Sequence, residues 1–164
     1  MSTTNVGVRQ ATEADGDSLL ELWHQFTDHL SEHDPRYEHS TDADEQWLSH
    51  FESQLIDSKY GTVFVAEAGD QIVGVLEARI SGGHPIFRLS DHGFINGHLV
   101  VKEYRGEGVG EQLVEAAVQW FEEHERDIDF CRVDTLESDD RASAAYEAMG
   151  FKSVERTYER HFDV

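Results

Sequence analysis

Hydrophobic residues recur along this chain with two different periods, and the changes between them predict both strands and helices. Residues 6–11 alternate between apolar and polar side chains, which is typical of a strand, whereas residues 12–32 place apolar side chains every three or four positions. Thr12 and Asp15 have the spacing of a helix-capping pair, so the helix is expected to begin there. Its apolar stripe consists of Leu19, Leu22, Trp23, Phe26 and Leu30.

Turn-forming residues divide the rest of the chain into further elements. Asp34-Pro35 ends the first helix, because the residue before proline is driven out of the helical region. Gly69-Asp70-Gln71 separates two runs rich in β-branched residues, 62–68 and 72–80, which are expected to pair as an antiparallel hairpin. The other expected elements are helices at 41–58, capped by Thr41, at 108–125 and at 139–150, capped by Ser138 or Asp139, strands at 94–101 and 128–136, a short strand at 86–89 and a pair of closing strands within 151–162.

This series predicts an α+β fold with a mixed, mostly antiparallel central sheet of six to seven strands and helices on both of its faces. A single domain over residues 1–164 is expected, because no proline- or serine-rich linker and no internal repeat divides the chain. The sequence holds no apolar run long enough for a membrane span and no signal-peptide core, so a cytoplasmic protein is expected. Cys131 is the single cysteine, which excludes an internal disulfide and fits a reducing compartment.

Acidic residues outnumber basic ones by 34 to 13, which gives a formal net charge of −21. The three tryptophans, five tyrosines and nine phenylalanines argue against disorder. Because the acidic side chains are spread evenly, we expect adaptation to high salt, as in a halophilic organism, rather than a cationic partner. The same balance argues against a basic face that could bind nucleic acid.

A glycine-rich turn at residues 105–110 follows the apolar run at 94–101 and carries the clearest chemical signal in the sequence. Its three glycines let the backbone approach a ligand, and N–H groups at the start of the next helix attract anions, so the turn suits a pyrophosphate. Arg105 can add a charge-assisted contact. The dinucleotide fingerprint G-x-G-x-x-G fits worse, because Glu111 and Leu113 occupy its final position in the two possible alignments.

Two blocks of sequence make the chain resemble the GNAT superfamily of acyl-CoA-dependent N-acyltransferases. The first is Arg105-x-x-Gly108-x-Gly110, which is similar to the acyl-CoA signature of Arg or Gln, two residues, Gly, one residue, then Gly or Ala. The second is Ala142-x-x-x-Tyr146-x-x-x-Gly150-Phe151, which resembles a downstream segment of the superfamily. Both blocks stand in the expected order, and with the N-terminal pattern the resemblance covers nearly the whole chain.

The resemblance implies that acetyl-CoA is bound where the fourth and fifth strands splay apart. Backbone groups near Leu99 would hold the pantetheine arm, and an N–H at Val100 or Val101 would stabilise the oxyanion. Asp139 stands where the superfamily often has asparagine, which would alter a contact with the cofactor arm. The expected cofactor-binding residues are Leu99, Val100, Val101, Arg105, Gly106, Glu107, Gly108, Val109, Gly110 and Asp139.

Direct attack of an amine on the thioester requires a proton acceptor and a proton donor. An alkylamine has a pKa near ~10.4 and a free thiol one of about 8.5. Tyr146 matches the superfamily's tyrosine and is the expected acid. Phe94 and Asn96 occupy positions where members often carry a glutamate, so His98, placed on the same strand face by alternation, is the candidate base, with a hydrogen-bonded core histidine as the competing interpretation. His92, or a water wire held by Asn96, is the alternative base.

The superfamily usually builds its acceptor pocket from the first helix, and the expected pocket residues are Trp23, Phe26, His29, His33 and His92. His29 and His33 are four apart, but no His-Glu-x-x-His motif or nearby cysteine accompanies them, so no metal is expected. Two classes of function remain: an N-acetyltransferase for a primary amine of a small molecule or protein, and a non-catalytic acyl-CoA-binding regulatory module. No nucleic-acid or membrane partner is expected, and a homodimer is left open.

Overall fold

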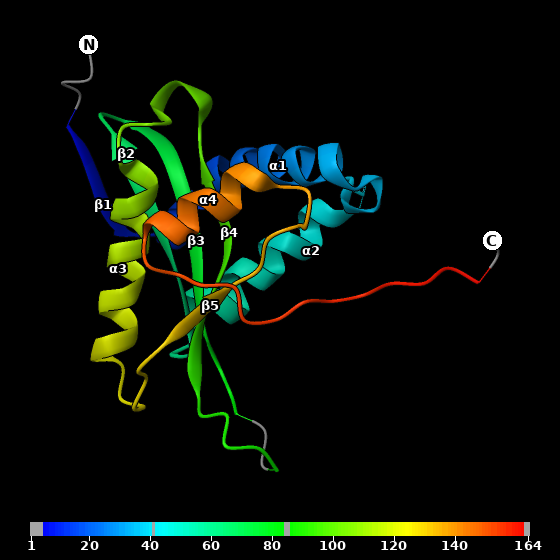
Figure 1. Cartoon of the computed structure of the whole chain (residues 1–164). Helices are drawn as coiled ribbons and strands as arrows, with labels where there is room; N and C mark the ends of the chain where they lie inside the picture. The colour runs from blue at the N-terminus through cyan, green and yellow to red at the C-terminus, as the bar shows by residue number, and fades with distance from the viewer. Residues whose placement is uncertain (1–4, 41, 84–85, 163–164) are drawn as a thin grey trace. The chain divides into compact units, whose positions relative to one another are not determined.

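The computed structural model describes residues 5–40, 42–83 and 86–162 (Figure 1). The chain divides into two compact units, with the boundary between Asp134 and Thr135. The first unit holds the whole sheet and three helices, and the second holds one helix and the C-terminal segment. The single domain expected from the chain length stays a prediction. The expected helix cap at Thr41 lies outside the described residues.

In the described part of the chain, five strands form the sheet, and they lie side by side in chain order, β1-β2-β3-β4-β5. The pairings from β1 to β4 are antiparallel, whereas β4 and β5 are parallel, so the mixed, mostly antiparallel sheet is confirmed. The strands are β1 (Val6–Gln10), β2 (Gly61–Ala68), β3 (Gln71–Ser81), β4 (His92–Val100) and β5 (Cys131–Val133).

The prediction of six to seven strands is wrong for the described residues, which contain five. Residues 86–89 form no strand, because Ile86 and Phe87 are exposed and the run has no face to bury. Residues 151–162 form no strand either. A strand needs a neighbouring strand to pair its backbone groups, and α4 (Asp140–Ala148) is the only regular element among the described residues of the second unit.

The first unit carries helices on both faces of its sheet. A Cβ on Gly74 of β3 would meet Leu113 of α3. Glu77 follows three residues later and therefore lies on the opposite face of β3, where it interacts with Trp47 of α2. No helix in the described part of the chain is long and apolar enough to cross a membrane. The helices of this unit are α1 (Gly16–His33), α2 (Ala43–His50), which continues as the π-helix η3 (Phe51–Ile56), and α3 (Val109–Glu123), with short 3-10 turns at Glu13–Asp15, Pro35–Tyr37 and Lys102–Tyr104.

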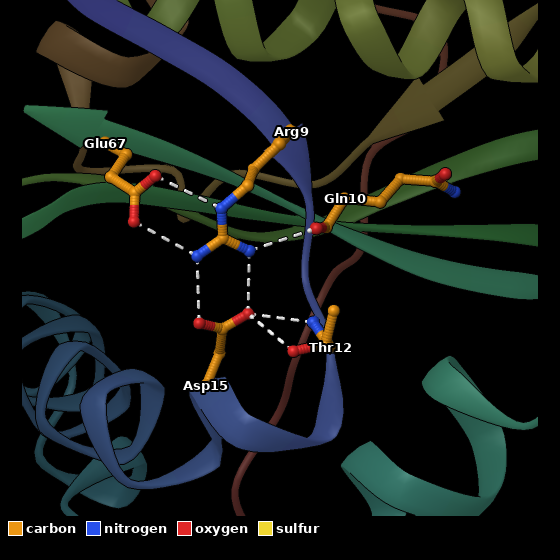
Figure 2. A network of polar contacts seen from close by, with 5 residues as sticks. All are labelled: Arg9, Gln10, Thr12, Asp15 and Glu67. Atoms are coloured by element: carbon orange, nitrogen blue, oxygen red, sulfur yellow. Dashed lines mark hydrogen bonds and ion pairs between the residues drawn. The ribbon is translucent and has the colours of Figure 1, made fainter. Parts of the chain in front are cut away.

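An ion-pair network holds the connection between β1 and α1 in place (Figure 2). The guanidinium of Arg9 donates to both carboxylate oxygens of Asp15, at 2.8 and 3.0 Å, and to both oxygens of Glu67 on β2, at 3.2 Å. Asp15 also accepts the backbone N–H of Thr12 at 2.8 Å, so the expected pairing of these two residues is confirmed. The hydrogen bond from Arg9 is the main cause that lowers the pKa of Asp15. The start of α1 is thereby anchored to the sheet.

A bulge at Gly97 changes which side chains of β4 share a face. Gly97 has φ +58°, the left-handed conformation that glycine adopts most easily. The register with β3 shifts at this point: Asn96 lies opposite Glu77, and Leu99 lies opposite Val75. Because Glu77 and Val75 are two residues apart and share a face, Asn96 and Leu99 also share one, although simple alternation would have separated them.

β4 and β5 separate after a short pairing. Their register runs only from Gly93 opposite Cys131 to Ile95 opposite Val133. Residues 96–100 of β4 continue along β3, and in the described part of the chain no strand pairs with their other edge. β5 is therefore shorter than the strand predicted at 128–136, and its early end leaves backbone groups of β4 open.

Candidate active site

The glycine-rich turn leads directly into α3. Gly106 and Gly108 have φ values of +81° and +84°, and a Cβ on either would meet nothing within 4 Å, so backbone conformation rather than space requires glycine. The first backbone bond within α3 runs from the N–H of Gln112 to the carbonyl of Gly108, at 3.0 Å. The N–H groups of residues 109–111 precede that bond, and a helix N-terminus with such groups attracts anions.

The open edge of β4 presents the backbone of Val100. The N–H of Val101 donates to the carbonyl of Val73 on β3, at 2.9 Å. In an antiparallel ladder, successive residues point their backbone groups to opposite sides, so the N–H of Val100 points away from β3, to the side where β5 has ended. Either of two N–H groups is expected to stabilise the oxyanion. That of Val101 already donates to Val73, whereas that of Val100 points to the open side and suits an oxyanion.

Arg105 links the turn to this strand edge. Its Nε donates to the carbonyl of Val100 at 2.9 Å. That bond connects Arg105, the first residue of the turn, to the last residue of β4. The turn and the strand edge thus form one continuous stretch of backbone, which suits the pyrophosphate and the thioester of the same molecule.

His98 does not share a face with Asn96, and the prediction that it does is wrong. The bulge at Gly97 reverses the alternation, so the imidazole faces α3, where a Cβ on Gly110 would lie 3.4 Å from Nε2. Burial lowers the pKa of His98 to about 4, although a backbone hydrogen bond with Gly110 opposes the shift. The imidazole therefore stays neutral and packs against the start of α3, as a core histidine does.

Glu77 is the buried carboxyl group that the sequence interpretation missed. It lies in the centre of β3, is 3% exposed, and has Asn96 opposite it on β4. Burial raises the pKa of Glu77, while Arg79, the indole of Trp47 and the side chain of Asn96 partly offset the shift. Asn96 itself is exposed. A carboxyl with a raised pKa, linked to the surface by a polar side chain, has the properties of a general base.

A row of aromatic rings borders Glu77. Trp23 of α1 lies 5.7 Å from Phe26 and 5.9 Å from Trp47 of α2, and Trp47 stacks on Phe51 at 5.3 Å, measured between ring centroids. Trp23 and Phe26 are half-buried, whereas Trp47 and Phe51 are buried. The predicted acceptor residues Trp23 and Phe26 thus lie in one row with Trp47, which approaches Glu77.

The three histidines expected in the acceptor pocket lie in two places. His29 and His33 contact each other near the end of α1, with ring centroids 5.3 Å apart. His92 is buried at the start of β4, stacks on Phe130 at 4.9 Å and bonds through Nδ1 to the carbonyl of Ser90 at 3.0 Å. His92 precedes Asn96 by four residues, or roughly 13 Å along a strand. That separation argues against His92 as the alternative base.

The second unit holds Tyr146 on α4. Burial, and after it the charge of Asp139, raise the pKa of Tyr146 to about 12. Asp139 is buried and caps α4 by accepting the N–H of Ala142 at 3.1 Å, which confirms one of the two expected caps. Phe151 packs edge-on against the tyrosine ring at 5.5 Å. The phenol therefore keeps its proton throughout the physiological range, as a proton donor must.

The sequence matches the acetyltransferase (GNAT) family over residues 20–151. It is also 33% identical, over 154 residues, to an aminoglycoside N(6')-acetyltransferase type 1 of Stenotrophomonas maltophilia, in an alignment that covers 91% of this chain and 88% of the relative. This chain belongs to the GNAT acetyltransferase family. As a GNAT acetyltransferase it is an enzyme that transfers an acetyl group from acetyl-CoA to an amine, rather than a non-catalytic acyl-CoA-binding module.

Solved structures share the fold of this GNAT acetyltransferase. An aminoglycoside 6'-N-acetyltransferase from Acinetobacter baumannii aligns with a TM-score of 0.76 at 20% identity, covering 98% of this chain and 99% of that one. A predicted acetyltransferase from Clostridium acetobutylicum, solved with acetyl-CoA, aligns with a TM-score of 0.76 at 18% identity, covering 96% of each chain. These likenesses confirm a GNAT-like α+β fold.

Proposed function

We propose that this N-acetyltransferase acetylates the 6'-amine of an aminoglycoside. The observation that carries the proposal is the 33% identity to an enzyme of that name over most of both chains. The aromatic row of Trp23 and Phe26 supplies an apolar surface on which a sugar ring can pack.

In the proposed reaction the amine nitrogen attacks the thioester carbonyl of acetyl-CoA directly. The N–H of Val100 stabilises the oxyanion of the tetrahedral intermediate. When this collapses, the carbon–sulfur bond breaks and an amide and a thiolate remain. The proton from the amine passes to Glu77 through a water held by Asn96, and Tyr146 donates a hydrogen bond and then its proton to the thiolate.

Glu77 takes the role that the sequence assigned to His98. The carboxyl of Glu77 and Asn96 lie on the face of the sheet where Trp47 of α2 interacts with Glu77, whereas the imidazole of His98 faces α3. A pKa near 4 also makes His98 a weak base beside an amine of pKa near ~10. Glu77, whose pKa is raised, accepts that proton more readily.

We infer further that two copies of the chain associate through residues 152–162. Val154, Tyr158 and Phe162 are 59, 84 and 91% exposed, and large apolar side chains exposed together mark an interaction surface. Pairing of this extended segment with a sheet edge of a second copy would bury them and satisfy its backbone. Light scattering should show a dimer for the full chain and a monomer for a chain ending at Phe151. A full-length monomer under the same conditions would contradict the assembly.

The acceptor is tested by release of free thiol from acetyl-CoA in molar KCl. The probes are an aminoglycoside with a 6'-amine, its counterpart with a 6'-hydroxyl, simple alkylamines and a lysine peptide. We expect the first to give by far the highest kcat/KM, because the relative that is 33% identical is named for this acceptor. A higher kcat/KM for the peptide or the alkylamines would refute the acceptor class and leave the acetyl transfer itself intact.

A further inference from the structure

A cluster of two histidines and one aspartate joins α1 to α2. His24 lies within α1, Asp44 in the first turn of α2, and His39 in the connection between them. The Nε2 atoms of both imidazoles reach the same oxygen, Oδ1 of Asp44, at 2.9 Å from His24 and 2.7 Å from His39. The two rings lie with their centroids 4.0 Å apart.

These three residues offer the donor atoms and the spacing of a metal centre. One ligand atom from each lies within 4.8 Å of the other two. Around a tetrahedral zinc ion with bonds of roughly 2.0–2.1 Å, neighbouring ligand atoms lie about 3.3 Å apart. A small outward shift of the carboxylate therefore admits an ion. The side chains of His24 and Asp44 are each 44% exposed, which gives them freedom to shift and gives an ion access.

His39 is more enclosed than His24, whose side chain is 44% exposed. His39 is 15% exposed, and its Nδ1 is buried with no hydrogen-bond partner in the described residues, so Nε2 is the atom that makes its polar contact.

We propose that His24, His39 and Asp44 bind a divalent cation, with zinc as the preferred ion, and that the ion ties α1 to α2. Imidazole nitrogen and carboxylate oxygen are ligands that zinc accepts in structural and catalytic sites alike. The tie would hold Trp23, the neighbour of His24, against Trp47, the indole 5.9 Å away on α2. Zinc binding at this site requires neither acetyl transfer nor a particular acceptor.

The test is calorimetric titration of zinc chloride into the full-length protein after chelator treatment. We expect one Zn²⁺ per chain and a rise in melting temperature, because an ion that binds only the folded state stabilises it. His24→Ala, His39→Ala and Asp44→Asn should each weaken zinc binding by at least roughly 10-fold. Absorption spectra of the Co²⁺-loaded protein give a second measurement, since they report the coordination geometry even where a variant is less stable.

The double variant His29→Ala/His33→Ala is the matched control, because it removes the neighbouring histidine pair of the same helix. It should keep the affinity, the stoichiometry and the Co²⁺ spectrum of the unchanged chain. Zinc binding that is lost in this control but kept in His24→Ala and His39→Ala would overturn the proposal. The proposal would also be overturned if the wild-type protein bound no zinc saturably, or if His24→Ala, His39→Ala and Asp44→Asn all kept the wild-type zinc affinity.

Discussion

Glu77 and His98 show how burial acts in opposite directions on an acid and a base. Glu77 is buried and His98 is half-buried, and the two side chains lie on opposite faces of the β3–β4 pair. Because burial disfavours the charged form, it raises the pKa of the carboxyl and lowers that of the imidazole. Near neutral pH the carboxyl is consequently the better proton acceptor, and the imidazole is a neutral packing group.

Glu77→Gln should lower kcat by about 10²-fold while raising stability at neutral and alkaline pH. The folded state keeps the Glu77 proton where the unfolded state has lost it, so the wild-type free energy of unfolding falls as pH rises from the ordinary glutamate pKa toward the raised one. Glutamine is uncharged and escapes that loss. Kinetics and thermal melts across a pH series that begins at the ordinary glutamate pKa and extends into the alkaline range measure both effects.

Glu67→Gln provides the control for Glu77→Gln. Glu67 is a carboxylate of the neighbouring strand β2 that pairs with Arg9 at 3.2 Å, and it lies opposite Ile72, five residues along β3 from Glu77. Its variant should keep kcat and gain no stability. Equal rates for Glu77→Gln and wild type would remove Glu77 from the reaction.

His98→Gln should change the pH dependence of stability and leave the acidic limb of kcat/KM in place. The folded pKa of His98, about 4, lies below the ordinary value of 6.5, so the unfolded state takes up a proton first as pH falls. The wild-type free energy of unfolding should therefore lose roughly 3 kcal/mol between pH 6.5 and pH 4 through this residue. Denaturant titrations should show a shallower decline in the variant. Disappearance of the acidic limb of kcat/KM instead would restore His98 as the base.

Tyr146→Phe should lower kcat on the order of 10²-fold and leave acetyl-CoA affinity nearly intact, since only a hydroxyl is removed. The variant Asp139→Asn separates the two causes that raise the pKa of Tyr146, which are burial and the charge of Asp139. Asparagine keeps a cap on α4 while the charge is lost. Ultraviolet titration, with Tyr146→Phe as the blank, should then find a phenol pKa below about 12. Undiminished turnover in Tyr146→Phe would make the residue a packing group.

At the scale of elements, sequence periodicity predicted most helices and strands because each buries one continuous face. The leucine and aromatic stripe of α1, the hairpin around Gly69 and the cap at Asp139 depend on neighbours in the chain. The bulge at Gly97 depends on a partner strand, and one extra residue moved His98 to the other face. Glu77 was missed because it stands in an apolar run where a carboxyl gives no periodic signal.

The glycine-rich turn predicts a specific loss of cofactor binding. Gly108→Val should abolish the rise in melting temperature that acetyl-CoA produces, because valine is strained at φ +84° and its bulk would occupy the approach to the turn. Gly69→Val is a matched control: it places the same residue at φ +62°, also with nothing within 4 Å of a Cβ, in the β2–β3 hairpin. It should be less stable yet keep the full ligand-induced shift. A shift that is kept in Gly108→Val and lost in Gly69→Val would mean that acetyl-CoA binds elsewhere.

At the scale of the whole molecule, the sequence interpretation was weakest where assembly decides the structure. The apolar residues from Phe151 to Phe162 predict a pair of closing strands, yet residues 152–162 are exposed and unpaired with any strand among the described residues. Apolar side chains indicate that a segment can pack against other residues, whereas strand pairing depends on a partner edge, which the sequence of one chain does not place.

The net charge makes the stability of the whole molecule depend on salt. A formal charge of −21 on 164 residues repels itself, and the repulsion is weak only where salt screens it. Circular dichroism and thermal melts should show the structure intact in molar KCl and progressively lost toward 10 mM salt, where the Debye length is about 30 Å. Sucrose in place of KCl should fail to rescue the fold, because it strengthens burial without screening carboxylates. Full stability at 10 mM salt, or equal rescue by sucrose, would mean that screening is not what high salt supplies.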